Sequence, residues 1–184
     1  MKIRVFVALD LPKETKEFLL NKIQLIDPDR ELRWEKSNKF HLTLKFIGEI
    51  EEAQLPEIKD VLKKVVKGCK PFELKLSKFG KFTRKGKVAV LWAGFAENTQ
   101  LSECVTKINL NLSNIGIPIE TKKYTPHITL LRIRKNIDNK ILHKFDNLTS
   151  EHEIYIASEI QLVRSTLKPT GSIYKILEKY NLKG

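Results

Sequence analysis

The four-residue pattern His-x-Thr-Leu occurs twice in the chain, and this repetition constrains the fold more than any other feature. The first copy is His41–Leu44, and the second is His127–Leu130, 86 positions further on. Both copies lie in runs of apolar and β-branched residues that are typical of strands. Side chains alternate along a strand, so each copy places an imidazole and a hydroxyl on one face. The spacing therefore predicts two similar halves, each containing one such strand.

The segments around these two strands show strand and helix patterns in turn. Strands are predicted over residues 2–9, 32–35, 41–47, 72–76, 87–93, 153–157, 159–164 and 173–179, with one more inside 124–133. Helices are predicted over residues 12–27, 54–67, 98–113 and 138–145, where apolar residues recur at helical spacing. A polar turn region is expected over residues 79–86.

Many of the connections between the predicted strands are too short for parallel crossovers. We therefore expect an α+β fold with two pseudo-symmetric lobes of mainly antiparallel sheet. The helices should lie outside the sheets, and the active-site cleft should lie between the lobes. No segment resembles a linker, so residues 1–184 are expected to form a single two-lobed domain.

Composition excludes several classes of protein. Of the 184 residues, 41% are hydrophobic, which excludes disorder of the whole chain. The longest nearly apolar run, residues 88–96, is too short to span a bilayer. The apolar stretch near the N-terminus stops at Asp10, so it does not resemble a signal peptide. We expect a cytoplasmic protein that does not bind a membrane.

The formal net charge of +12 bears on the binding partner. Excess Lys and Arg attract polyanions such as RNA, but they also make a solubilising surface, and charge alone leaves both interpretations open. The heavy use of Lys, Glu and Ile, with a single Met, leans toward a thermophilic source. Cys69 and Cys104 are 35 positions apart and form no C-x-x-C pattern, so two half-buried free thiols are expected.

Two imidazoles facing one cleft suit proton transfer in both directions near neutral pH. One neutral histidine accepts a proton from a nucleophile, while the other, protonated, donates one to the leaving oxygen. The hydroxyls of Thr43 and Thr129 can donate hydrogen bonds to an anion between them. A phosphodiester fits this arrangement. No Asp/Glu-rich cluster lies beside either copy in the sequence, so no metal is expected.

These motifs resemble those of the RNA 2′,3′-cyclic phosphodiesterases, also called 2′-5′ RNA ligases, of the two-histidine phosphoesterase superfamily. The resemblance covers nearly the whole chain. It is carried by Arg4–Pro12, His41–Gly48, Thr125–Arg132, Ser165–Leu167 and Gly171–Tyr174.

The resemblance implies a bilobal fold that hydrolyses an RNA 2′,3′-cyclic phosphate to a 2′-phosphomonoester, without a metal or another cofactor. It also implies ligation of such an end to a 5′-hydroxyl through a 2′-5′ linkage. The partner would be RNA with a 2′,3′-cyclic phosphate end, tRNA fragments included, and the protein is expected to act as a monomer.

The resemblance also implies roles for individual residues. His41 would be the general acid that protonates O3′, and His127 the general base that activates the nucleophile. Thr43 and Thr129 would hold the phosphoryl oxygens, and Arg132 would contact the phosphate. The sequence alone does not distinguish the acid from the base, because the two copies are nearly equivalent.

Strict alternation makes further predictions along these strands. Leu42, Leu44 and Phe46 should face the core, whereas Lys45 should share the face of His41 and add positive potential there. Alternation would turn Arg132 away from His127 unless a twist or bulge intervenes.

Other candidates have weaker signals. His143 and His152 are expected to be surface histidines. The basic stretch Lys78–Lys87 is either a mobile loop that grips RNA or a solvated hairpin tip. Trp34 and Trp92 are expected in the core or the cleft wall, where Trp34 could stack a base.

Two rival functions remain open at this point. One is a non-catalytic RNA-binding module that keeps the cleft. The other is a two-histidine phosphodiesterase that acts on a small nucleotide.

Overall fold

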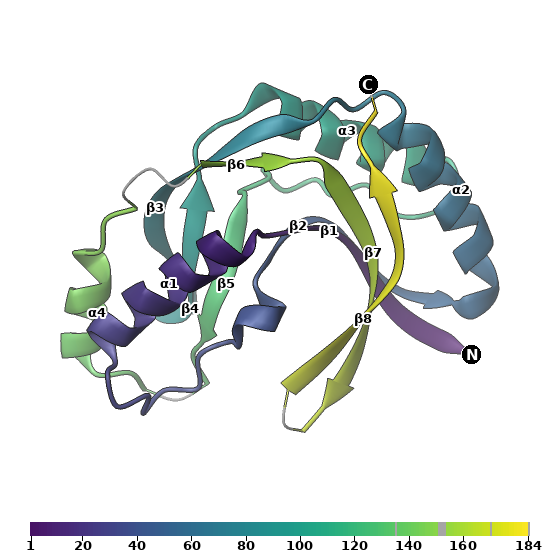
Figure 1. Ribbon diagram of the computed structural model, residues 1–184. Coiled ribbons are helices and arrows are strands. Elements are labelled where there is room, and N and C mark those ends of the chain that lie inside the picture. The colour runs from purple at the N-terminus through teal and green to yellow at the C-terminus, as the bar shows by residue number, and fades with distance from the viewer. Residues whose placement is uncertain (135, 151–153, 170, 184) are drawn as a thin grey trace.

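The computed structural model describes residues 1–134, 136–150, 154–169 and 171–183. The chain forms two four-stranded sheets that curve toward each other (Figure 1). The strand orders are β2-β1-β7-β8 and β5-β4-β3-β6, and every neighbouring pair is antiparallel. The α+β, two-lobed fold class is therefore confirmed.

Apart from the predicted strand over residues 32–35, the helices and strands occur in the predicted order. The strands are β1 Lys2–Asp10, β2 His41–Glu51, β3 Phe72–Arg84, β4 Lys87–Phe95, β5 His127–Arg132, β6 Ile154–Ala157, β7 Glu159–Lys168 and β8 Gly171–Asn181. The helices are α1 Lys13–Ile26, α2 Leu55–Val66, α3 Thr99–Ser113 and α4 Asn139–Asp146. Two short 3₁₀ helices, η1 Ser37–Lys39 and η2 Glu52–Gln54, precede β2 and α2.

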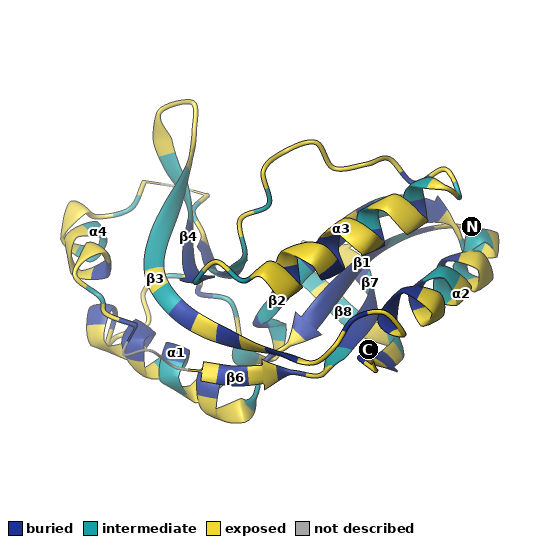
Figure 2. Cartoon of the chain, turned by 90° about the horizontal axis from the view of Figure 1, so that it is seen from above, coloured by how far each residue is buried: buried dark blue, intermediate teal, exposed yellow. Residues whose placement is uncertain are grey.

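Helices α2 and α3 lie side by side on the outer side of the β2-β1-β7-β8 sheet (Figures 1 and 2). In α2, Pro56 fits the first turn because its missing N–H needs no partner there. Glu57 lies near the N-terminus and Lys63 and Lys64 near the C-terminus, which complements the helix dipole. Each helix turns a buried stripe inward and an exposed face outward (Figure 2).

Helices α1 and α4 contact each other, and α4 packs on β3 of the other sheet. Phe145 of α4 is fully buried and meets the Phe79 ring edge-on, with centroids 5.7 Å apart. Lys81 of β3 pairs with Asp146 at 2.7 Å between Nζ and Oδ2. These helices cover the outer faces of the sheets, so the inner faces are left to form the site.

Two sequence predictions about the strands were wrong. Residues 32–35 form no strand; the Glu35 amide only donates one hydrogen bond to the Leu130 carbonyl at the edge of β5. The stretch 79–86 is mostly strand, because β3 continues to Arg84 and pairs with β4 from Leu76 onward. The turn shrinks to Lys85 and Gly86, whose φ angles are 51° and 74°.

Of the predicted strand over residues 153–157, the described part is β6; residue 153 lies outside the described residues. Within the described ranges, no helix combines the length and the apolar character that a membrane crossing requires.

Candidate active site

Strand β2, at the edge of its sheet, places the first motif. The partner register pairs Asp10 with His41, Leu9 with Leu42 and Ala8 with Thr43. Leu9 and Leu42 are buried in the core, so His41 and Thr43 face the opposite, concave side. The register then skips Leu44, which is therefore the extra residue of a β-bulge.

The bulge at Leu44 reverses the expected orientation of the next two residues. Lys45 pairs with the core residue Val7, is buried, and donates a 2.6 Å hydrogen bond to the Pro118 carbonyl. Lys45 therefore does not join the site. Phe46 is 48% exposed rather than in the core. Both predictions were wrong for the same reason, because a bulge shifts alternation by one residue.

Strand β5, at the edge of the other sheet, repeats this geometry. Trp92 pairs with Thr129, and Leu91 pairs with Leu131, so Leu130 is the bulged residue. The bulge returns Arg132 to the face of His127 and Thr129. The bulge that Arg132 required is therefore present at the equivalent position of the second motif.

The two edge strands β2 and β5 come together, and their motif side chains converge in one pocket. All five predicted site residues line it, namely His41, Thr43, His127, Thr129 and Arg132. Three more residues that sequence reasoning did not assign complete the lining, namely Glu35, Lys39 and Tyr174.

The three additional residues had little signal in the sequence. Tyr174 lies in the closing segment that carries the family resemblance, but no pattern gave it a role. Glu35 falls in a predicted strand, residues 32–35, that the structure does not contain. Lys39 ends the 3₁₀ turn η1 just before β2, a short element that periodicity does not detect.

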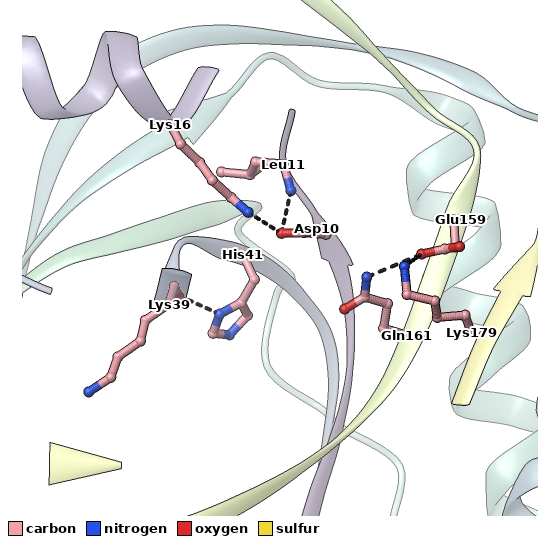
Figure 3. A network of polar contacts seen from close by, with 8 residues as sticks. All are labelled: Asp10, Leu11, Lys16, Lys39, His41, Glu159, Gln161 and Lys179. Carbon is pink, nitrogen blue, oxygen red and sulfur yellow. Dashed lines mark hydrogen bonds and ion pairs between the residues drawn. The ribbon is translucent and has the colours of Figure 1, made fainter. Parts of the chain in front are cut away.

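The histidines of the two motifs are held in the same way. Nδ1 of His41 lies 2.7 Å from the Lys39 carbonyl oxygen (Figure 3), and Nδ1 of His127 lies 2.7 Å from the Thr125 carbonyl oxygen. A carbonyl only accepts, so Nδ1 carries the proton and donates in each ring. The neutral tautomer thus leaves both Nε2 atoms as acceptors for the pocket.

Aromatic rings pack against each imidazole from its own lobe. The centroids of Phe6 and Tyr174 lie 4.9 and 5.3 Å from that of His41. The centroids of Phe82 and Trp92 lie 4.8 and 6.1 Å from that of His127. The rings restrict the rotation of both imidazoles and reduce their contact with water.

Burial in this apolar setting lowers the pKa of both histidines below the usual value of about 6.5, because it disfavours the charged form. The carbonyl hydrogen bonds oppose this effect, and the positive charge of Arg132 adds to it. The Asp10 carboxylate also acts on His41, where it raises the pKa. Figure 3 shows Asp10 beside His41, with Lys16 donating to Oδ1 of Asp10 at 2.6 Å.

The remaining candidates lie outside the pocket lining. Trp34 lies in the core, one of its two predicted positions, and donates its indole N–H to Asp27 at 2.7 Å, so its ring does not face the pocket for base stacking. Trp92 lies in the cleft wall beside His127. His143 is exposed on α4, whereas His152 falls outside the described residues.

The basic stretch and the cysteines are also placed. Lys78–Lys87 forms the tip of the β3–β4 hairpin, which projects from the body of the protein (Figure 2). Its contact with RNA stays a prediction. Cys69 and Cys104 are free, fully buried rather than half-buried, and adjacent; burial and the neighbouring thiol raise the pKa of Cys104.

In the part of the chain that the structure describes, no three His, Cys, Asp or Glu side chains gather in a group that could hold a metal ion. The pocket instead offers two imidazoles, three hydroxyls and two cationic side chains. Such a set of donors can bind an anion, and its imidazoles can move protons on either side of it.

Comparison with known proteins agrees with this geometry. The family model described as "LigT like Phosphoesterase" matches residues 9–92, which include the first motif. An RNA 2′,3′-cyclic phosphodiesterase of Methanocaldococcus jannaschii is 32% identical over 182 residues, which cover 97% of this chain and 100% of the relative. One of Thermotoga maritima is 31% identical, covering 99% of this chain and 97% of the relative.

Solved structures show the same fold. The crystal structure of TT0787 of Thermus thermophilus superposes with a TM-score of 0.86 at 27% identity, covering 99% of each chain. Escherichia coli LigT, solved in complex with 3′-AMP, superposes with a TM-score of 0.81 at 22% identity, covering 100% of each chain. The chain therefore belongs to the RNA 2′,3′-cyclic phosphodiesterase family of LigT-like phosphoesterases.

Proposed function

We propose that the protein hydrolyses the 2′,3′-cyclic phosphate at the end of an RNA to a 2′-phosphomonoester. The observation that carries this proposal is the convergence of His41, Thr43, His127 and Thr129 from two lobes in one pocket that also holds Arg132. Relatives over nearly the full length are named RNA 2′,3′-cyclic phosphodiesterases, which supports the same substrate.

In the proposed step, water attacks phosphorus and O3′ leaves. Nε2 of His127 takes a proton from water as the oxygen attacks phosphorus, and the bond between phosphorus and O3′ breaks. Protonated His41 gives its proton to O3′, so the products are a 2′-phosphomonoester and a 3′-hydroxyl. Thr43 and Thr129 would donate to the non-bridging oxygens, and Arg132 would neutralise charge on the phosphoryl group.

The surroundings of the two histidines support this assignment of acid and base. Asp10 is the direct β1 partner of His41, and its carboxylate favours the protonated imidazole. Burial and Arg132 favour the neutral form of both rings, but within the described residues no carboxylate opposes them at His127. Asp10 therefore supports His41, rather than His127, as the ring that carries the proton.

The same step would join RNA ends if a 5′-hydroxyl replaced water as the nucleophile, giving a 2′-5′ linkage. We propose this ligation as a secondary reaction, since no separate site is needed for it. We also propose, from the sequence, RNA fragments such as those of tRNA as substrates and a cytoplasmic monomer as the active form.

The test is incubation of the purified protein with an oligoribonucleotide that ends in a 2′,3′-cyclic phosphate, in buffer with EDTA. We expect a single product, the 2′-phosphomonoester, identified by phosphorus NMR. No turnover would favour an RNA-binding module. Turnover of a cyclic mononucleotide but not of the oligonucleotide would favour a small-nucleotide enzyme. A 3′-phosphomonoester product would contradict the assignment of O3′ as the leaving group.

A further inference from the structure

Glu35 places a carboxylate in a pocket that otherwise suits an anion. Its Oε2 lies 3.7 Å from Nζ of Lys39, and its Oε1 lies 3.9 Å from Nε of Arg132. Its side chain is only 25% exposed, and it lines the pocket together with both cations. A negative charge at this place repels a phosphate, so its position calls for a functional explanation.

The backbone fixes this carboxylate in place. The Glu35 amide donates a 2.8 Å hydrogen bond to the carbonyl of Leu130, the bulged residue that brings Arg132 into the pocket. The preceding residue, Trp34, is buried, and its indole N–H donates to Asp27 at 2.7 Å. The backbone of Glu35 is thus tied to β5, next to a residue that is anchored in the core.

The three charged groups keep their hydrogen-bonding capacity for a ligand. Charge-assisted N–H···O contacts are about 2.7–2.9 Å long, so separations of 3.7 and 3.9 Å leave the donors of Lys39 and Arg132 available. Glu35 therefore changes the charge of the pocket without occupying its donors. With two cations and one carboxylate, the charged side chains of the lining sum to one positive charge.

We propose that Glu35 is a specificity-determining residue that makes the pocket prefer a singly charged phosphodiester over a doubly charged phosphomonoester. The inference rests on the proposed function. A cyclic phosphate carries one negative charge, whereas the phosphomonoester formed from it carries nearly two above its second pKa of about 6. Glu35 repels the product more strongly than the substrate, so it speeds product release and limits product inhibition.

The size of the effect follows from the charge of the ligand. Coulomb energy is proportional to ligand charge, so removing Glu35 should strengthen monoester binding twice as much, on a logarithmic scale, as cyclic diester binding. We expect the dissociation constant for adenosine 2′-monophosphate to fall about tenfold and that for the cyclic diester about threefold.

The test compares Glu35→Gln with Glu31→Gln, which removes the same charge from the same loop outside the pocket lining. At pH 8, calorimetry gives the affinity for adenosine 2′-monophosphate, and kinetics give KM for adenosine 2′,3′-cyclic phosphate and the inhibition constant of the product. We expect Glu35→Gln to strengthen binding of the product more than binding of the substrate. Glu31→Gln should change neither the affinity for the product nor KM for the substrate.

A second variant, Lys39→Gln, removes a positive charge and should have the opposite effect on binding. Lys39→Gln should weaken the monoester more than the cyclic diester, and unchanged melting temperatures would exclude loss of folding in either variant. Equal changes for the two ligands, or weaker binding of both in Glu35→Gln, would overturn the proposal. Failure of the unmodified protein to hydrolyse any cyclic phosphate would overturn the proposed function instead, and the two affinities would still report the charge preference.

Discussion

The Tyr124 hydroxyl donates a 2.9 Å hydrogen bond to the backbone carbonyl of Thr43. Tyr124 lies in the segment that leads into β5, whereas Thr43 belongs to the first motif on β2, so this bond ties the two motif strands together. Burial raises the pKa of Tyr124, which keeps its hydroxyl protonated as a donor. The distance between the two halves of the site therefore depends on a direct contact between them.

Tyr124→Phe should loosen this tie without changing the pocket lining. Losing one hydrogen bond to a partly buried carbonyl should cost about 1 kcal/mol of unfolding free energy. The larger effect should be a rise in KM with a fall in kcat, since both threonine hydroxyls must reach one phosphate. Denaturant unfolding and steady-state kinetics measure the two effects. Unchanged kinetics alongside reduced stability would limit the bond to a structural role.

The pH dependence of kcat/KM should reveal the lowered pKa values. The proposed reaction needs one histidine protonated and the other neutral, and burial lowers the pKa of both His41 and His127 below about 6.5. Above that pH the protonated acid becomes scarce, so kcat/KM should fall about tenfold per pH unit. A pH optimum above 8 would contradict this expectation.

Asp10→Asn should shift the pH range in which kcat/KM falls, the alkaline limb of the pH profile. The carboxylate raises the pKa of His41, so removing it should lower that pKa and shift the limb to lower pH. The amide oxygen can still accept the bond that Leu11 donates to Asp10. Asp29→Asn removes the same charge from an exposed position and should leave the profile unchanged.

Arg132→Met should lower kcat/KM by about two orders of magnitude, because an electrostatic contact to the developing charge is lost. Arg132→Lys should recover only part of this activity, since an ammonium group lacks the planar fork of the guanidinium. Arg134→Met, two residues further along and exposed, is the matched control. Equal losses in the two Met variants would show that general positive charge, rather than Arg132, assists the reaction.

Gly80→Ala tests whether the aromatic rings of Trp92 and Phe82 hold His127 in place. A Cβ at Gly80 would lie 2.3 Å from the Trp92 ring, so the indole must move, and Trp92 and Phe82 pack together beside His127. We expect lower stability and at least tenfold lower kcat, an order-of-magnitude figure for a misplaced catalytic group. Trp92→Leu in the same protein should relieve the clash and recover stability. Additive losses in the double variant would contradict this explanation.

The sequence predicted the architecture of the site better than its detail. Motif spacing and alternation correctly paired His41 with Thr43 and His127 with Thr129 on one face of two strands, which the structure places at the sheet edges. Simple alternation gave the wrong face for the residues that follow Leu44 and Leu130, because these two leucines are bulged. A bulge depends on the partner strand rather than on the local sequence pattern.

The longer-range contacts were beyond the reach of any periodic pattern. Glu35 reaches the pocket because Asp27 holds Trp34 and because Leu130 accepts from the Glu35 amide, and both contacts exist only in the folded chain. The strand β3 extended past its predicted end because β4 supplied partners for its polar residues. Tertiary pairing thus overrode local propensity at these places.

In the proposed reaction, His41 and His127 act as acid and base on one phosphodiester. The most direct test measures single-turnover rates of His41→Ala and His127→Ala on an oligoribonucleotide 2′,3′-cyclic phosphate and on its analogue with sulfur in place of O3′. Each variant should lose about two to four orders of magnitude on the normal substrate. A thiolate leaves without a proton, so the analogue should restore His41→Ala toward the unmodified rate but leave His127→Ala slow. Near-normal rates in either variant, or rescue of His127→Ala instead of His41→Ala, would contradict the assignment.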